Sequence, residues 1–109
     1  MAQPVRITQL PEAPLDAAAA FHREHLARAR EALSLEDAAV LLFDPAGHEH
    51  DAWRLAAVRE LAREAAPKRV NAIAGSDTAA IEQAMAYLEA AHGVTGQLLA
   101  VDGKTGQNR

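Results

Sequence analysis

The chain has 109 residues, a formal net charge of −4 and no cysteine. These figures exclude more than one domain, as well as disulfides, zinc–thiolate sites and thiol catalysis. The sequence has no basic run, which argues against binding to nucleic acid, and no apolar stretch long enough to span a membrane. The first residues lack the apolar segment of a secretory signal, so we expect a cytoplasmic protein.

The first half of the chain predicts a strand, a long helix and a second strand. Residues 5–10 alternate in character and end at a proline, which is typical of a strand. Residues 15–33 are alanine-rich, with apolar residues at helical spacing. Residues 38–43 are all apolar, which favours a strand buried on both faces of a parallel sheet. The expected buried face of the helix comprises Leu15, Ala19, His22, Leu26, Ala29 and Leu33.

A second helix and a third strand are expected in the middle of the chain. The helix runs over residues 51–66 and stops at Pro67, which cannot continue it. The strand covers residues 69–74. The expected buried face of this helix comprises Leu55, Val58, Ala62 and Ala65.

A third helix and a fourth strand follow. Ser76 or Asp77 is expected to cap the helix by accepting a hydrogen bond from its free amides. Gly93 suits the left-handed position that ends a helix, and residues 97–101 form the strand. The expected buried face of the helix comprises Ile81, Met85, Leu88 and His92.

This βαβαβαβ order predicts an α/β fold with a four-stranded parallel sheet and flanking helices. We expect the strand order 1-2-3-4. The domain covers residues 1–103, and residues 104–109 form a polar tail.

Two stretches, residues 57–75 and 84–103, carry recognisable motifs. In that order, they resemble the helix and strand after the catalytic tyrosine, and the last helix and strand, of short-chain dehydrogenases/reductases. The first stretch matches at Leu61, Ala62, Glu64, Ala66, Pro67, Arg69, Val70, Asn71, Ile73 and Gly75. The second matches at Leu88, Thr95, Gly96, Gln97, Val101, Asp102 and Gly103.

The resemblance implies a Rossmann-like half-fold, equivalent to the family fold from its fourth strand onward. It also implies that the helices over residues 15–33 and 51–66 pair across a dimer axis, and we expect Ala57 on the contact face. A sheet face that one helix cannot cover and an unpaired first strand point the same way. We therefore expect a homo-oligomer through these helices, or docking on a full-length reductase.

The residues on which the family's chemistry depends differ in this chain. Its Tyr-x-x-x-Lys pair aligns with Gly47 and Asp51, and Asp44-Pro45 stands where its serine is expected. No glycine precedes Gly47, so the glycine-rich turn that binds the dinucleotide phosphates has no counterpart.

The remaining candidates for the catalytic pair lie too late in the chain. They are the single tyrosine, Tyr87, and the two lysines, Lys68 and Lys104. We therefore predict no catalytic residues, no cofactor and a non-catalytic, self-associating pseudoenzyme derived from a reductase.

The histidines leave a metal-binding protein, or a residual oxidoreductase, as a weaker alternative. Residues 48–51 combine two imidazoles with two carboxylates, and His22 and His25 lie three residues apart on the first helix. No HExxH spacing is present. A solvated loop is therefore favoured for residues 48–51 and a packed or interfacial role for His22, and no metal ligand is predicted.

Other noticeable residues receive structural interpretations. His92 is expected to complement the dipole at the end of the third helix, and Trp53 to serve as a packing or interface anchor. Asn71 is expected to tie its strand to a neighbouring backbone. The Gly-Lys-Thr of residues 103–105 lacks the earlier glycine and the following helix of a phosphate-binding loop.

Overall fold

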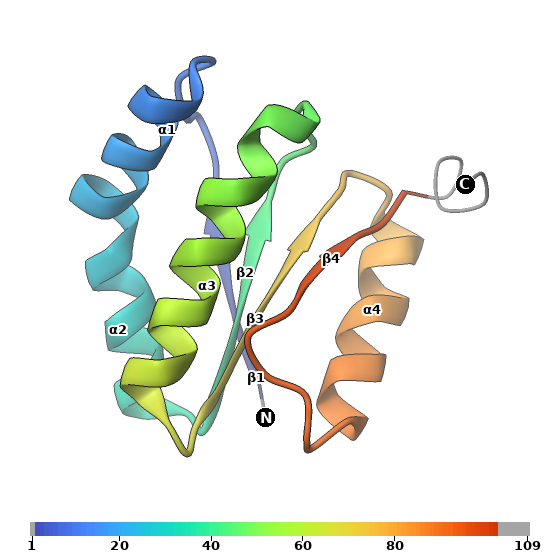
Figure 1. The fold of residues 1–109 in the computed structure, drawn as a ribbon. Coiled ribbons are helices and arrows are strands. Elements are labelled where there is room, and N and C mark those ends of the chain that lie inside the picture. The colour runs from blue at the N-terminus through green and yellow to red at the C-terminus, as the bar shows by residue number, and fades with distance from the viewer. Residues whose placement is uncertain (1, 103–109) are drawn as a thin grey trace.

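Four parallel strands form one sheet, and their order in the sheet is their order along the chain (Figure 1). The computed structural model describes residues 2–102. The strands are β1 (Ala2–Ile7), β2 (Ala38–Phe43), β3 (Arg69–Ala74) and β4 (Leu98–Ala100). The helices are α1 (Pro14–Ala20), α2 (Leu26–Leu35), α3 (Asp51–Ala65) and α4 (Thr78–Ala90). These elements confirm the α/β half-fold and the strand order predicted from the sequence.

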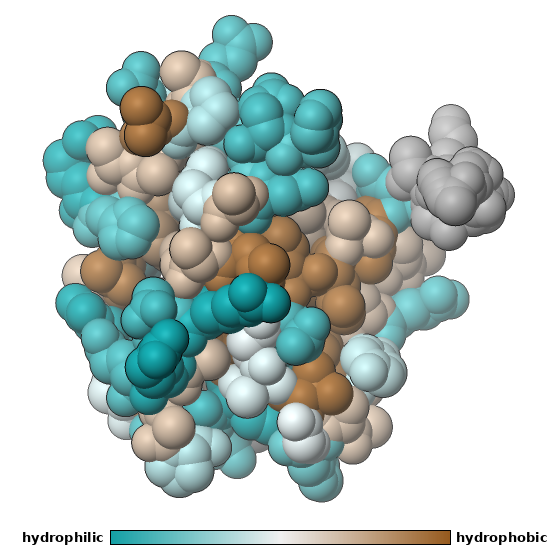
Figure 2. All heavy atoms as spheres, in the orientation of Figure 1, coloured by the Kyte–Doolittle hydropathy of each residue, from teal (hydrophilic) through white to brown (hydrophobic). Residues whose placement is uncertain are grey.

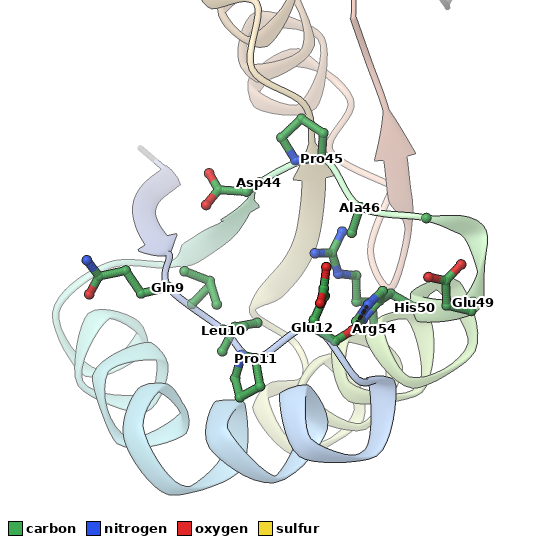
Figure 3. Close-up of a pocket in the computed structure, with 12 residues that line it drawn as sticks. Gln9, Leu10, Pro11, Glu12, Asp44, Pro45, Ala46, Glu49, His50 and Arg54 are labelled. Carbon is green, nitrogen blue, oxygen red and sulfur yellow. Dashed lines mark hydrogen bonds between the residues drawn. The ribbon is translucent and has the colours of Figure 1, made fainter.

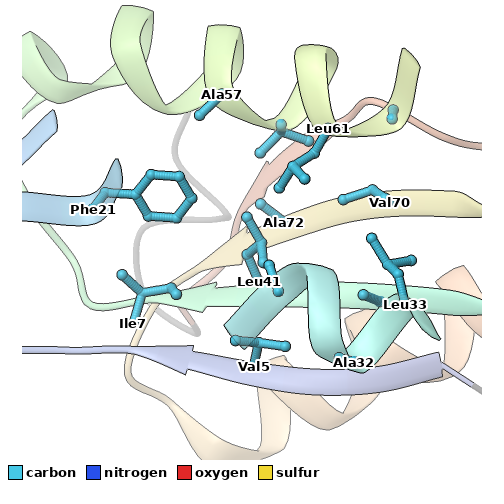
Figure 4. Packing of buried hydrophobic residues seen from close by; sticks show 14 of the residues in the cluster. Val5, Ile7, Phe21, Ala32, Leu33, Leu41, Ala57, Leu61, Val70 and Ala72 are labelled. Atoms are coloured by element: carbon cyan, nitrogen blue, oxygen red, sulfur yellow. The ribbon is translucent and has the colours of Figure 1, made fainter. Parts of the chain in front are cut away.

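Helices α1, α2 and α3 cover one face of the sheet, and α4 covers the other (Figure 1). All six residues of β2 are buried, because successive side chains point to opposite faces and both faces are covered. Leu41 and Phe43 belong to the larger core, under α2 and α3, where Phe21 also lies (Figure 4). Val40 and Leu42 belong to the smaller core, under α4.

Strand β1 begins and ends three residues earlier than expected. It pairs with β2 from Ala2 opposite Ala38 to Ile7 opposite Phe43, so both strands end together. Gln9 then takes a left-handed backbone conformation, with a φ of 61°, and turns the chain away from the sheet. The prediction placed the strand too late because its first residues include a proline.

The outer edge of β1 is less open than the sequence suggested. Pro4 has no N–H to offer to another strand, which is a common protection of edge strands. The Arg28 guanidinium on α2 donates to the carbonyl of Arg6 on β1, at 3.0 Å. The unpaired edge is therefore a weaker reason for association than expected.

The first helix is interrupted by a π-helical turn, η1 (Phe21–His25), between α1 and α2. Here the N–H of Leu26 donates to the carbonyl five residues earlier, so the turn holds one residue more than an α-helical turn. The predicted face is right at Ala29 and Leu33 but wrong before α2: Leu15 is 86% exposed, and Ala19 and His22 are also exposed. The buried residues in that part are Ala17, Ala20 and Phe21.

The buried face of α3 is shifted from the predicted one. Leu55 and Ala65 are only partly buried, whereas Val58 and Ala62 are buried as expected. Ala57 is 7% exposed and packs into the protein's own core, so it does not lie on an outer contact face. The complete buried face comprises Arg54, Ala57, Val58, Leu61 and Ala62.

The ends of α4 differ from the expected capping. Asp77 occupies the N-cap position, but no side-chain hydrogen bond caps the helix there. His92 is exposed and lies beyond the last helical residue, Ala90, so it does not pack on the expected stripe. The glycine with a left-handed conformation is Gly96, with a φ of 76°, rather than Gly93.

One helix covers the second face of the sheet better than expected. Val40 and Ile73, both under α4, are 1% exposed. The part of this face that belongs to β1 carries Pro4 and Arg6, both exposed. The expectation of a bare apolar face is therefore wrong, because α4 buries the apolar residues of β2 and β3 on this face.

Candidate functional site

A cavity of about 410 Å³ lies at the edge of the sheet where β1 and β2 end. The loops after these strands and the start of α3 form its walls (Figure 3). In open α/β sheets, ligands bind outside the carboxyl ends of the strands, which makes this cavity the candidate site. Its apolar lining includes Ile7, Leu10, Pro11 and Pro45, and its charged lining comprises Glu12, Asp44, Glu49 and Arg54.

His50 is buried beside this cavity, although the sequence suggested a solvated loop. It ends a 3-10 turn, η2 (His48–His50), that leads directly into α3. Its Nδ1 accepts a hydrogen bond from the Trp53 indole N–H, and its Nε2 donates to the carbonyl of Glu12, both at 3.0 Å. The two partners specify the neutral tautomer with the proton on Nε2, and they leave neither ring nitrogen free for a metal.

Trp53 packs within an aromatic cluster, as the sequence predicted. Its ring lies 5.7 Å from both the Phe21 and the Phe43 rings, between centroids. The Phe43 ring meets it edge-on, with an interplanar angle of 89°. These contacts join η1, β2 and α3 next to His50 and Arg54, which line the cavity.

Arg54 is the residue of the site that sequence reasoning missed. It is 5% exposed, and its guanidinium carbon lies 4.5 Å from the centroid of the Phe43 ring. Its Nε has no hydrogen-bond partner. Burial lowers the pKa of the Arg54 guanidinium, and the nearby carboxylates of Asp51 and Asp44 oppose that shift. The spacing of Arg54 could have indicated its burial, because Arg54 falls on the same helical face as Ala57 and Leu61.

Of the two positions aligned with the family's catalytic pair, only Gly47 lines the cavity, and neither carries equivalent chemistry. Gly47 lines the cavity, and a β-carbon built there would lie 2.3 Å from the Glu49 carboxylate. Asp51 is exposed in the first turn of α3. The residues that replace the family's serine, Asp44 and Pro45, are exposed after β2.

Tyr87 and Lys68 are not at this site. Tyr87 lies on α4, on the opposite face of the sheet, and is 54% exposed. The Lys68 ammonium donates to the carbonyl of Leu33 and so satisfies the C-terminal end of α2. Lys104, and with it the Gly-Lys-Thr of residues 103–105, lies outside the described residues.

The other histidines are also dispersed. His22 is exposed, and its Nδ1 contacts the carbonyl of Ala18 at 2.8 Å. His25 accepts a hydrogen bond from Arg28 at 2.8 Å, and burial together with the charge of Arg28 lowers the pKa of His25. Within residues 2–102, no group of three or more histidine, aspartate and glutamate side chains is placed to hold a metal ion.

The two stretches that carry the family resemblance interlock. The Asn71 amide donates to the carbonyl of Val94, and its oxygen accepts from the Gln97 N–H, each at 3.0 Å. This confirms that Asn71 ties β3 to a neighbouring backbone. The Thr95 hydroxyl accepts from the N–H of Val70 at 3.0 Å. The residues that match the family motifs therefore hold β3 to the segment before β4.

Asp102 extends this structural role to the start of α4. Its Oδ1 accepts hydrogen bonds from the N–H groups of Ser76 and Asp77, at 2.9 and 3.0 Å. A carboxylate from the segment after β4 thus fixes the two residues that precede α4. At the other end of α4, the Arg69 guanidinium donates to the carbonyls of Leu88 and Ala91.

A protein-family model described as short chain dehydrogenase-like protein matches residues 5–101. The chain therefore belongs to the short chain dehydrogenase-like family. Comparison with curated proteins and with solved structures gives no significant match. None of the helices formed by residues 2–102 is long and apolar enough to cross a membrane.

The residues at the cavity do not fit the nicotinamide dinucleotide that the family implies. Strands β1 and β2 lead into segments containing Gln9, Pro11 and Pro45, not into a glycine-rich turn whose amides face a phosphate. The cavity lining also carries three carboxylates against one guanidinium. A diphosphate placed there meets net repulsion.

Proposed function

We propose that this protein is a non-catalytic, self-associating member of the short chain dehydrogenase-like family. The observation that carries the proposal is a division among the motif residues. Asn71, Thr95 and Asp102, which match the family, all bind backbone groups. Gly47 and Asp51, which replace the catalytic pair, supply neither a phenol nor an ammonium at the cavity.

A groove between α2 and α3 supports the self-association. It has a volume of about 330 Å³, and its lining includes Leu26 and the exposed Ala56. Arg30 and Glu64 bridge the two helices through paired hydrogen bonds of 2.8 Å, which hold the groove in one shape. Two copies related by a two-fold axis would bring the same groove together twice.

A second apolar surface lies beside the edge strand β4. Its lining includes Leu98, Leu99 and Tyr87, and Figure 2 shows apolar side chains gathered along β4. The proposal places the principal contact at α2 and α3, because alanine-rich helices approach each other closely. The β4 surface is the alternative location.

Light scattering at micromolar protein concentration tests the association. We expect a dimer for the parent chain and a monomer for Ala56→Glu, because a charge would be buried at the contact. Ala79→Glu is the matched control, since Ala79 is exposed on α4 and lies away from the groove. Ala57 is unsuitable because it is buried within the fold.

A monomeric parent chain would refute self-association, and a dimeric Ala56→Glu variant would refute its location. The alternative partner is a full-length reductase that docks on the same groove. A monomer that forms a stable complex with a co-expressed reductase, and loses it in Ala56→Glu, would establish that alternative.

The non-catalytic assignment has its own test. Calorimetric titration with NAD and NADP should give no saturable heat, and no nicotinamide oxidation should occur with small ketones. The double variant Gly47→Tyr and Asp51→Lys should remain inactive, because proximity to a fixed cofactor supplies about 7–11 kcal/mol in well-oriented systems. Turnover by the parent chain that is lost on changing Asp44 or His50 would contradict the assignment.

A further inference from the structure

Arg54 presents an unsatisfied cationic group at the base of the cavity between the ends of β1 and β2. Arg54 is only 5% exposed, yet its Nε has no hydrogen-bond acceptor. Buried polar groups are normally hydrogen-bonded, so an orphaned donor calls for an explanation. The contact with the Phe43 ring holds the guanidinium carbon at 4.5 Å but supplies no acceptor in the guanidinium plane.

The position of Arg54 directs this group toward the cavity. The residue lies one turn into α3, and Figure 3 shows its guanidinium near the loop that contains Ala46. The His50 imidazole cannot serve as its acceptor, since both ring nitrogens already have partners. The Arg54 Nε therefore has no acceptor among residues 2–102, and an anionic group that enters the cavity would meet this guanidinium.

The rest of the cavity lining restricts the charge of a ligand. Glu12, Asp44 and Glu49 are exposed and line the same cavity, which leaves it with two more negative than positive groups. A polyanion is disfavoured there, and the three carboxylates also repel a simple carboxylate. A ligand with one anionic and one cationic end matches the lining.

We propose that this cavity binds a small zwitterion of the amino-acid type. Its carboxylate binds the Arg54 guanidinium, and its ammonium faces the carboxylates of Glu12, Asp44 and Glu49. A guanidinium binds a carboxylate through two parallel N–H···O bonds, which here come from its terminal nitrogens because Nε is buried. The volume of about 410 Å³ lies in the lower range of small-molecule sites.

The apolar part of the lining indicates what kind of side chain the ligand carries. Ile7, Leu10 and Pro11 bring apolar groups to the wall formed by β1 and the loop after it. A short aliphatic side chain fits this wall better than a charged one. The proposal does not require self-association, because all of these residues belong to one copy of the chain.

NMR detection of the Arg54 Nε–H, combined with calorimetry, tests the proposal on the full chain. The probes are the twenty standard amino acids, β-alanine and glycine betaine, each at about 10 mM. We expect a saturable shift of this signal with at least one short aliphatic amino acid. Its matched carboxylic acid and its matched amine, each lacking the other charged group, should bind at least about tenfold more weakly.

Variants separate the two ends of the ligand. Arg54→Met should weaken binding by at least about tenfold, while Arg63→Met, an exposed arginine on the same helix, should leave it unchanged. The double variant Asp44→Asn and Glu49→Gln changes only exposed residues, so it tests the site even if Arg54→Met does not fold. It should weaken binding of the amino acid and strengthen binding of the matched carboxylic acid.

Three results would overturn the proposal. They are the absence of a saturable shift with every probe, binding of the carboxylic acid as tight as that of the amino acid, and undiminished binding in a folded Arg54→Met variant. Light scattering on the same samples reports the oligomeric state separately, so a failure of ligand binding can be told apart from a failure of self-association.

Discussion

Replacement of Asn71 by alanine should destabilise the protein strongly. Asn71 is 2% exposed, and its amide makes hydrogen bonds of 3.0 Å to the carbonyl of Val94 and the N–H of Gln97. Alanine would leave these two partly buried backbone groups without a partner. Two lost hydrogen bonds, each with a net contribution of about 1 kcal/mol plus part of a desolvation penalty, give a loss of about 2–3 kcal/mol.

Urea unfolding followed by circular dichroism measures this loss. Because a small domain is stable by only about 5–15 kcal/mol, the midpoint should move clearly, and Tm should fall by roughly 10–20 °C. Gln97→Ala is the matched control, since Gln97 contributes its backbone N–H and its side chain is exposed. A change of less than about 0.5 kcal/mol for Asn71→Ala would refute the structural role assigned to this side chain.

Two further predictions concern a tight contact and a titrating group. Gly75→Ala should destabilise the fold by about 1–3 kcal/mol, because the added β-carbon would lie 1.9 Å from the carbonyl oxygen of Val101. Gly93→Ala is the control and should have no such effect, because no atom lies within 4 Å of a β-carbon built there. Equal unfolding midpoints for the two variants would contradict the contact at Gly75. Because the pKa of His25 is lowered in the folded protein, the unfolded chain binds the proton at a higher pH than the folded chain does. The contribution of His25 to the free energy of unfolding should therefore be constant well above pH 6.5 and should fall as the pH is lowered through 6.5. His25→Gln should flatten that decline in denaturant unfolding measured at several pH values, and an unchanged pH profile would be inconsistent with this reasoning.

Strands β2 and β3 could be predicted to the residue, whereas the face of the first helix could not. Residues 38–43 are apolar throughout, so a strand buried on both sides was the natural interpretation. Periodicity also gave the helix over residues 51–65 to within one residue at its end. The buried face before η1 was missed because a periodic extrapolation assumes a constant number of residues in every turn.

The candidate site shows a different limit of sequence reasoning. The departure from the family's Tyr-x-x-x-Lys motif could be recognised from the sequence at Gly47 and Asp51, because alignment with this motif needs only local spacing. Arg54 was overlooked because an arginine on a helix is normally exposed, and its burial depends on Phe43 from a distant strand. His50 was placed in a solvated loop for the same reason: its partner is the carbonyl of Glu12, 38 residues away.

The π-helical turn has a consequence for the comparison of this chain with its relatives. A homologue with an unbroken α-helix in this place would have one residue fewer between Phe21 and His25. An alignment that puts its gap in the loop before the helix would then pair the exposed His22 with the homologue's counterpart of the buried Phe21. A single-residue gap inside the helix restores the correspondence, and deletion of the exposed Arg23 would produce the uninterrupted form in this protein.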